Sequence, residues 1–352
     1  MNIGVLGAGQ LGRMLALSGY PLGHRFRFLD PTSDSTAGRL TDHLAFDFLD
    51  ESALDKFADG LDVITYEFEN VPVYTAQYLE MVVPVYPPPA ALEKAQDRYI
   101  EKSFLSALGV PTPRFTIDIT AAFGFPAVLK TRRMGYDGKG QKIIRSEAEL
   151  GNEPLDGLIM EEYVSFDREL SMIAARNRSA EMKFYPLVEN HHRDGILRLS
   201  LVTGNVLPEL QRQAEEYITR VMTTLDYVGV LAIEFFEKGG RLLANEMAPR
   251  VHNSGHWTIE GAVTSQFENH IRAVTDAPLG NTSPLGVCAM VNLIGHLPDV
   301  KSILKIDGAH LHVYDKAPRP RRKIGHVTFV ERDMDTLLRK LDLLKEIADV
   351  FR

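Results

Sequence analysis

The chain has 352 residues, of which 45% are hydrophobic and 24% charged, as in a soluble globular protein with room for two or three domains. Its formal net charge of −8 argues against a nucleic-acid partner, and its single cysteine, Cys288, excludes an internal disulfide framework and suits a reducing compartment. With neither a secretory leader nor an apolar run long enough to cross a bilayer, we expect a cytoplasmic protein with no membrane partner.

The first residues show a pattern typical of nucleotide-binding α/β domains. Residues 2–6 predict a strand, residues 7–12 carry the spacing G-x-G-x-x-G, and a helix is expected from Arg13 onward. Asp30 ends the next predicted strand, at the distance where dinucleotide-binding folds place a ribose-binding acid. The glycines alone indicate only a helix N-terminus open to an anion, so a dinucleotide and another phosphate both stay open.

Polar residues follow the strand predicted over residues 61–66. Glu67, Glu69 and Asn70 come at its carboxyl end, the edge where α/β sheets bind ligands. The alternative is that Glu69 and Asn70 cap a helix. Four prolines between residues 84 and 89 then indicate a stiff crossover, and we place the first domain boundary after residue 92.

The centre of the chain holds a basic, glycine-rich loop. A helix is predicted over residues 95–108, and Arg98 in its first turn opposes the helix dipole, which weakly indicates an anionic partner. Residues 126–129 predict a buried strand, which opens at Lys130 into a loop with three glycines and four cations that ends at residue 141. Such a loop suits a nucleotide phosphate, although its spacing is not that of a Walker A motif. The alternative is an ordinary solvated hairpin turn.

Two further strands could complete a nucleotide site. The backbone of the strand over residues 158–164 could hydrogen-bond an adenine edge, and Glu169 in the next strand could hold ribose hydroxyls. Each glutamate could equally be a solubilising residue of an edge strand. His191 and His192 follow a strand expected to end at Val188, and with no third ligand at metal spacing they do not make a zinc site.

An acidic hairpin gives the most specific signal. Residues 229–236 and 241–249 predict two strands that turn at Gly239 and Gly240. Glu234 and Glu246 are symmetric about Gly240, so they should face each other, give or take one residue of register. Two carboxylates in apolar strands repel each other, and a divalent cation, with Mg²⁺ favoured, would resolve this. Asn245 could add an oxygen ligand, and the alternative is that one glutamate points outward.

The hairpin runs directly into a dense polar segment, residues 250–257, which contains the only tryptophan and suits recognition of a small polar molecule. Gln266, Asn269 and His270 on the next predicted helix could be no more than its polar face.

The C-terminal region starts near Pro284. Strands are predicted over residues 287–294, 310–314 and 325–330, and a helix over residues 334–347. Residues 315–323 contain five cations, which favour a phosphomonoester site over a nucleic-acid patch, with a solvated basic loop as the alternative.

Several strings together resemble one enzyme family. They are Glu67-Phe68-Glu69-Asn70-Val71-Pro72, Gln96-Asp97-Arg98, residues 135–141, residues 245–258 and Arg322-Lys323-Ile324-Gly325-His326. The chain resembles the N5-carboxyaminoimidazole ribonucleotide synthetases, ATP-grasp enzymes that form the ATPase subunit of phosphoribosylaminoimidazole carboxylase. The resemblance runs nearly end to end.

The resemblance implies a mixed α/β and α+β ATP-grasp fold in three parts: a Rossmann-like preATP-grasp domain (1–92), an ATP-grasp domain (93–280) with a small mobile subdomain at about 113–165, and a β-rich C-terminal domain (281–352) that completes the ribonucleotide site. The implied reaction joins 5-aminoimidazole ribonucleotide and bicarbonate at the expense of ATP, through carboxyphosphate, in de novo purine synthesis. A cytoplasmic homodimer is also implied.

The resemblance further implies roles for individual residues. The residues expected to bind ATP are Arg98, Lys130, Gly135, Tyr136, Asp137, Gly138, Lys139, Gly140, Gln141, Glu161, Glu162, Tyr163, Val164, Glu169, His192, Asn245 and Glu246. Those expected to bind the other substrates are Gly9, Gln10, Leu11, Glu67, His252, Asn253, Ser254, Lys316 and Arg322. The expected catalytic residues are Glu67, Tyr136, Asp137, Arg250 and Lys316, with Asp137 orienting or deprotonating the substrate amine. Glu234 and Glu246 would hold one or two Mg²⁺ ions, for which Mn²⁺ could substitute.

Three residues depart from the family pattern, because Met134, Asp315 and Arg321 stand where glycine is expected. We expect Met134 to stiffen the central loop and Arg321 to add charge for a phosphate. Three other functions stay open: another ATP-grasp carboxylase or formate ligase, a nicotinamide-dependent dehydrogenase built on residues 7–12, and a nucleotide sensor without turnover. The acidic hairpin argues against the dehydrogenase, and Lys130 with both hairpin acids argues against the sensor.

Overall fold

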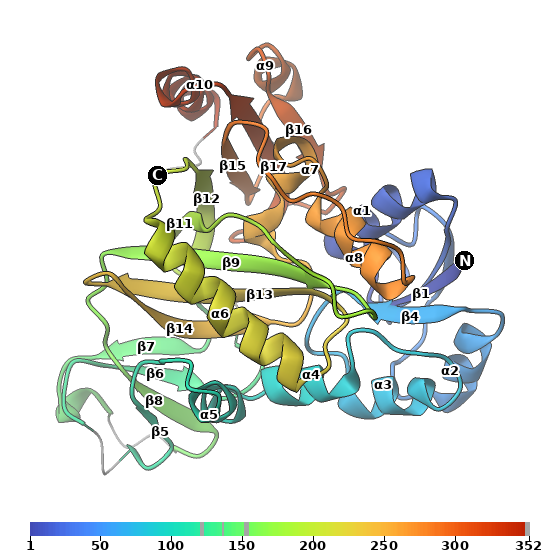
Figure 1. Cartoon of the computed structure of the whole chain (residues 1–352), viewed down its shortest axis with the longest axis horizontal. Coiled ribbons are helices and arrows are strands. Elements are labelled where there is room, and N and C mark those ends of the chain that lie inside the picture. Colours follow the sequence, from blue (N-terminus) through green and yellow to red (C-terminus); the bar gives the residue numbers. More distant parts are fainter. Residues whose placement is uncertain (120–122, 136, 151–154, 349–352) are drawn as a thin grey trace.

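The computed structural model describes residues 1–119, 123–135, 137–150 and 155–348. Within this part of the chain, no helix combines the length and the apolar character needed to span a membrane. The strands form three sheets, and helices cover them as Figure 1 shows.

The N-terminal sheet is parallel, in the order β3-β2-β1-β4. Its strands are β1 (Asn2–Leu6), β2 (Arg25–Leu29), β3 (Asp42–Leu44) and β4 (Val63–Tyr66). The helices around it are α1 (Gln10–Gly19), the short 3-10 helix η1 (Tyr20–Leu22), α2 (Glu51–Ala58), α3 (Val73–Glu80) and α4 (Pro89–Ala95). Helix α1 therefore begins three residues before the predicted Arg13. Pro72 is the N-cap of α3, so the helix-capping alternative for Glu69 and Asn70 is wrong.

Helix α5 (Arg98–Ala107) leads into a small antiparallel sheet in the order β5-β8-β6-β7. Its strands are β5 (Phe115–Thr116), β6 (Ala127–Thr131), β7 (Gln141–Ile144) and β8 (Leu158–Glu162), with the 3-10 helix η3 (Glu147–Leu150) after β7. The helix predicted over residues 95–108 is interrupted, because Asp97 caps α5 by accepting from Tyr99 N and Ile100 N. Lys130 lies inside β6, opposite Gln141, rather than at the start of the loop.

The third sheet has nine strands, in the order β14-β13-β9-β11-β12-β15-β17-β16, with β10 on β9. Its central strands are β9 (Arg168–Arg176), β10 (Met182–Phe184), β11 (Val188–Arg193), β12 (Ile196–Val202), β13 (Gly229–Lys238) and β14 (Arg241–Ala248). Helix α6 (Pro208–Thr224) crosses the face of β9, β13 and β14 in the middle of Figure 1. His191 and His192 lie within β11, so the prediction that this strand ends at Val188 is wrong.

The C-terminal strands continue the same sheet, because β12 pairs with β15. The elements after the hairpin are η4 (Asn253–Gly255), α7 (Thr258–Gly261), α8 (Gln266–Val274), β15 (Val287–Ile294), α9 (Val300–Leu304), β16 (His310–Val313), β17 (Lys323–Glu331) and α10 (Met334–Ile347). Helix α9 was not predicted, whereas β15 and α10 have their predicted bounds. A shared core joins α1 to α8 and the large sheet, through residues such as Met14, Ile173 and Ile271.

Candidate functional site

The acidic hairpin places two carboxylates opposite each other. β13 and β14 pair with Glu234 facing Glu246, as the sequence predicts. Lys238 pairs with Arg241 and Phe235 with Ala244, so the register must slip by one residue before Glu234. A bulge at Asn245 supplies this slip, and without it Glu234 would face Asn245.

The surroundings of the two glutamates separate their pKa values. Burial, followed by the charge of Glu246, raises the pKa of Glu234 to about 7. Burial also opposes ionisation of Glu246, but Arg98 outweighs it and brings the pKa of Glu246 to about 2. Arg98 Nη1 lies 2.7 Å from Glu246 Oε2, so the arginine that opposes its own helix dipole has an acidic partner across the site.

A buried ion network joins the small sheet to the hairpin. Glu161 Oε2 lies 2.9 Å from Lys130 Nζ and 3.3 Å from Lys102 Nζ. Lys130 also donates to Asn245 Oδ1 at 3.2 Å, and Lys102 donates to the Asn245 carbonyl at 2.9 Å. The Glu161 side chain is 2% exposed and Glu161 pairs with residues of both β5 and β6, so it is a partner of the two lysines inside the sheet.

The other residues of the predicted adenine strand differ in exposure. Glu162 pairs with Arg114 at 3.0 Å, and its amide donates to the Arg114 carbonyl. β8 ends at Glu162, two residues before the predicted end, and it is followed by Tyr163, which is exposed, and Val164, which is buried. Glu169 Oε2 lies 2.9 Å from His192 Nδ1, and although burial lowers the pKa of His192, this hydrogen bond raises it above the ordinary value.

The glycine-rich loop is the connection between β6 and β7. Gly138 and Gly140 have φ angles of 74° and 72°, which favour glycine. Met134 also has a positive φ, of 60°, so the backbone keeps the left-handed conformation that suits glycine although methionine stands there. Arg98 Nη2 donates to the Gly135 carbonyl at 3.4 Å, while Lys139 and Gln141 are exposed. Tyr136 lies outside the described residues.

Glu67 occupies the helix N-terminus made by the first glycine motif. Its carboxylate accepts from Gly12 N at 2.6 Å and from Gly9 N, and a Cβ at Gly9 would lie 2.6 Å from Glu67 Oε1. Asp30 accepts from Ala8 N at 3.1 Å. The amides that would bind a dinucleotide pyrophosphate therefore bind the protein's own Glu67, which argues against the dehydrogenase interpretation.

Lys316 approaches the same place from the C-terminal region. Its ammonium donates to Gln10 Oε1, and burial lowers its pKa to about 8, partly offset by the charge of Glu67. Leu11 packs its side chain into the core and can offer only its backbone to a ligand.

Polar contacts fix the segment after the hairpin. Arg250 pairs with Glu69, and His252 Nδ1 lies 2.8 Å from Ser254 Oγ. Asn253 and Asn292 exchange hydrogen bonds of 3.1 and 2.7 Å. The predicted substrate residues of this segment are thus brought together and oriented by buried partners.

Other polar residues of this segment have structural roles. His256 and Trp257 are completely buried in the core, so the expectation that they help to form a recognition loop is wrong. The alternative of a merely polar helix face for α8 is also wrong, because Gln266, Asn269 and His270 are fully buried and hydrogen-bonded.

The basic loop between β16 and β17 contacts two other parts of the molecule. Asp315 and Arg321 have φ angles of 55° and 65°, again at positions where glycine would be unstrained. Asp315 pairs with Arg39, and Lys323 Nζ lies 2.7 Å from Asp137 Oδ1. Arg321 donates to two backbone carbonyls and is exposed, so the expectation that it adds charge for a phosphate stays a prediction. Arg322 donates to the Ala317 carbonyl within the loop.

Sequence reasoning missed residues that support the site. Lys102 and Glu101 are buried on α5, and Glu101 accepts from Met247 N at 2.6 Å, next to Glu246. Burial, followed by the charge of Glu246, raises the pKa of Glu101 to about 8. A signal existed, because Glu101 precedes Leu105 by one helical turn and so lies on the apolar stripe of the helix.

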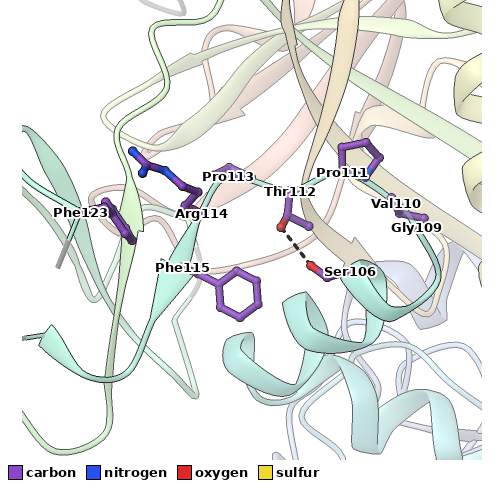
Figure 2. Close-up of a pocket in the computed structure, with 9 residues that line it drawn as sticks. All are labelled: Ser106, Gly109, Val110, Pro111, Thr112, Pro113, Arg114, Phe115 and Phe123. Carbon is purple, nitrogen blue, oxygen red and sulfur yellow. Dashed lines mark hydrogen bonds between the residues drawn. The ribbon is translucent and has the colours of Figure 1, made fainter. Parts of the chain in front are cut away.

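A cavity of about 620 Å³ lies elsewhere, at the connection from α5 to β5. Figure 2 shows its lining, in which Phe115 and Phe123 stand beside the segment from Gly109 to Arg114. Among the described residues, none that is predicted to bind ATP, metal or substrate lines this cavity.

Comparisons with known proteins cover nearly the whole chain. Residues 1–96 match the ribonucleotide synthetase preATP-grasp domain, residues 103–267 the ATP-grasp domain, and residues 288–340 the phosphoribosylaminoimidazole carboxylase C-terminal domain. The expected ATP-grasp fold is therefore confirmed.

Individual relatives point to the same family as these domain matches. The chain is 51% identical to an N5-carboxyaminoimidazole ribonucleotide synthase of Pseudomonas aeruginosa, over 96% of each chain. The crystal structure of the synthetase from Thermus thermophilus superposes with a TM-score of 0.94 at 55% identity, covering 98% of both chains. A synthase from Aspergillus clavatus, solved with ADP and 5-aminoimidazole ribonucleotide, superposes with a TM-score of 0.87 at 29% identity, covering 98% of this chain and 99% of that one. This chain belongs to the N5-carboxyaminoimidazole ribonucleotide synthase family.

Proposed function

We propose that this chain is an ATP-dependent ligase that carboxylates 5-aminoimidazole ribonucleotide with bicarbonate, giving N5-carboxyaminoimidazole ribonucleotide, ADP and phosphate in purine biosynthesis. The observation that carries the proposal is the Glu234–Glu246 pair, which lies beside Arg98 and the Lys130–Asn245 contact, where two antiparallel sheets meet. Membership of the synthase family indicates which substrates the site binds.

In this proposal ATP lies between the small sheet and the hairpin. Lys130 and Arg98 neutralise its phosphates, and the backbone of residues 135–141 covers them with N–H groups. The backbone just after β8, at Tyr163 and Val164, would hold the adenine edge, and Glu169, oriented by His192, would accept from the ribose hydroxyls.

The two hairpin acids have the chemistry of a magnesium site. Within the described residues, no cluster of three or more His, Cys, Asp or Glu side chains could hold a metal alone, so phosphate oxygens and water would complete the shell. Glu234 and Glu246 offer the hard oxygen ligands that Mg²⁺ prefers, and both burial and, to a lesser extent, the charge of Glu246 raise the pKa of Glu234, so a cation would favour its ionised form. When bound, Mg²⁺ would neutralise charge on the transferring phosphoryl group.

The reaction needs no covalent enzyme nucleophile. A bicarbonate oxygen attacks the γ-phosphorus, the bond to ADP breaks, and carboxyphosphate forms. Carboxyphosphate collapses to CO₂ and phosphate, and the amine of the ribonucleotide attacks CO₂ and loses a proton. The protein contributes cations that stabilise the transferring charge, and a covered site that keeps water from the intermediate.

We place bicarbonate and the ribonucleotide beside Glu67 and Lys316. These two residues meet at the α1 N-terminus, and residues 9–11 lie in the same turn. We also propose that Arg250, His252 and Asn253, held by Glu69, Gln266 and Asn292, contact the substrates, and that the fully buried Ser254, bonded to Ser171, supports His252. Arg322 in the basic loop would bind the ribonucleotide phosphate.

Asp137 is proposed to orient or deprotonate the substrate amine. Asp137→Asn should lower kcat by about 10²-fold, in the range of a general base, while KM for ATP changes little. Initial rates at saturating substrates measure this, with Asp335→Asn on the distant helix α10 as the matched control. Full activity in Asp137→Asn would remove the proposed role.

Deprotonation of Lys316 should make kcat/KM for the ribonucleotide fall at alkaline pH. The pKa of this ammonium is lowered to about 8, so it carries its charge below that pH and loses it above. We expect kcat/KM for the ribonucleotide to fall about tenfold per pH unit above about pH 8, because this ratio reports the free enzyme. Lys316→Arg should remove this alkaline limb of the pH profile, since a guanidinium stays charged up to about pH 12. An unchanged limb in Lys316→Arg would assign it to another group.

We propose domains over residues 1–92, 93–280 and 281–352, with a small mobile subdomain at about 113–165, in a homodimeric, cytoplasmic enzyme.

The identity of the product tests the function. Incubation with ¹³C-bicarbonate, Mg·ATP and 5-aminoimidazole ribonucleotide should give a ¹³C carbamate resonance that disappears on acidification. Label found elsewhere on the product, or ADP formed with no labelled product, would contradict the assigned reaction.

A further inference from the structure

Three loops that lie far apart in the sequence meet at one arginine. They are the central loop around Asp137, the turn between β11 and β12 at Asp194 and Gly195, and the basic loop that contains Arg321. Arg321 Nη2 donates to the Asp137 carbonyl at 3.0 Å and to the Asp194 carbonyl at 2.9 Å. A single guanidinium thus bridges the backbones of the other two loops.

The backbones themselves are in contact at this junction. A Cβ on Gly138 would lie 2.8 Å from the Asp194 carbonyl oxygen and 2.9 Å from Gly195 Cα. A Cβ on Gly195 would collide with Gly138 Cα and lie 2.9 Å from Gly138 N. Neither position has room for a side chain while the loops stay in place, so the two glycines are required for the contact that Arg321 bridges.

The backbone at Arg321 is unfavourable for an arginine. Its φ of 65° lies in the left-handed region, which side chains with a Cβ rarely adopt. The residue at the other end of the basic loop, Asp315, has a φ of 55° and forms an ion pair with Arg39 of the N-terminal region. Each of these two strained positions therefore carries a side chain that ties the basic loop to another part of the molecule.

The junction connects the two substrate sites of the proposed reaction. Arg321 is adjacent to Arg322, proposed for the ribonucleotide phosphate, and two residues from Lys323, which pairs with Asp137. On the other side lie Asp137 and Gly138, in the loop proposed to cover the ATP phosphates. A ligand that orders the basic loop would therefore also order the loop over residues 135–141, called the ATP loop below. By linkage, a ligand that orders the ATP loop would also favour binding at the basic loop.

We propose that Arg321 is a positioning residue that couples ribonucleotide binding to the placement of the ATP loop. The proposal rests on the proposed function, because that function assigns the ribonucleotide to the basic loop. Arg321 acts through backbone carbonyls of the ATP loop and does not itself contact the reacting atoms.

The coupling can be measured as a ratio of affinities. The dissociation constant of a non-hydrolysable ATP analogue with Mg²⁺ is determined by calorimetry with and without 5-aminoimidazole ribonucleotide, in bicarbonate-free buffer. In the unaltered protein the ribonucleotide should lower the dissociation constant of the analogue by about fivefold or more. This factor is the lower end of ordinary coupling between two sites. In Arg321→Gly the ratio should fall to about one, while the affinity for the analogue alone changes less than twofold.

Two further variants separate positioning from a general structural effect. Arg321→Gly also relieves the strain of a left-handed backbone. Ala180→Gly relieves the same strain at an exposed turn with a φ of 62°, so it should leave the ratio of the two dissociation constants unchanged. Gly195→Asn tolerates the left-handed backbone but adds the Cβ that pushes the loops apart, and it should lose the ratio as Arg321→Gly does. In steady state, Arg321→Gly should raise KM for ATP at saturating ribonucleotide more than it lowers kcat.

The possible results separate the two proposals. An unchanged ratio in Arg321→Gly would overturn the positioning role. A ratio of one in the unaltered protein, with turnover intact, would overturn the coupling alone. A protein that does not bind the ribonucleotide at all would overturn the proposed function, and the coupling with it.

Discussion

Replacing Glu246 by glutamine is expected to lower kcat by about 10²–10³-fold, the range found when one preorganised electrostatic group is removed from a site of charge transfer. Glutamine keeps the size of the side chain and can still accept from Arg98, but it lacks the negative charge that would hold Mg²⁺. The loss should be accompanied by a weaker dependence of the residual rate on Mg²⁺ concentration. Glu234→Gln should behave similarly, because the two acids face each other across the ladder.

The measurement is the initial rate of ADP formation against Mg²⁺ concentration, at saturating ATP and ribonucleotide. Glu216→Gln on α6 is the matched control, because this exposed acid pairs with Arg220 along its own helix and its loss should leave the rate unchanged. More than a tenth of the rate remaining in Glu246→Gln, with an unaltered Mg²⁺ dependence, would mean that the hairpin acids do not hold the metal.

The second large effect is on stability. Glu161→Gln should lower the free energy of unfolding by about 3–5 kcal/mol, the usual cost of leaving a buried charge without its partner. Two lysine side chains, Lys102 at 0% and Lys130 at 8% exposure, would lose the carboxylate they share. Adding Lys102→Met to Glu161→Gln should recover part of the loss, because it removes one uncompensated charge.

Urea unfolding followed by circular dichroism measures this difference. Its matched control is the next residue, since Glu162→Gln breaks a largely exposed pair with Arg114 and should cost less than about 1 kcal/mol. Equal losses in the two variants would contradict the assignment of Glu161 to a buried ion network.

The sequence predicted much of the acidic hairpin for a physical reason. The ladder of a hairpin is anchored at its turn, so two glycines and two alternating strands place Glu234 and Glu246 within one residue of each other. The final residue of register could not be predicted, because it depends on the bulge at Asn245, where two buried lysines from other elements bind the backbone and the side chain.

The first glycine motif shows the opposite case. The pattern correctly predicted a strand, a tight turn and a helix, but not what binds at the helix N-terminus. Glu67 fills that place, and its contact with Gly12 joins residues 55 positions apart in the sequence. Composition also cannot reveal whether a side chain is buried. His256 and Trp257 were therefore predicted to take part in recognition, although they lie in the core.

The basic loop could be recognised from its charges, but the residues that it contacts could not be predicted. Arg321 and Lys323 reach Asp137 across more than 180 positions, and neither propensity nor spacing reports such a distance. The substitutions at Met134, Asp315 and Arg321 proved informative, because all three residues keep the positive φ that suits glycine.

The most direct test of the account is phosphate release from Mg·ATP, measured in CO₂-depleted buffer with the ribonucleotide and bicarbonate each present or absent. Rapid release is expected only when both are present, with one phosphate formed for each acid-labile carbamate. Rapid release without the ribonucleotide, or no release in any combination while ATP still binds, would contradict the proposed carboxylation.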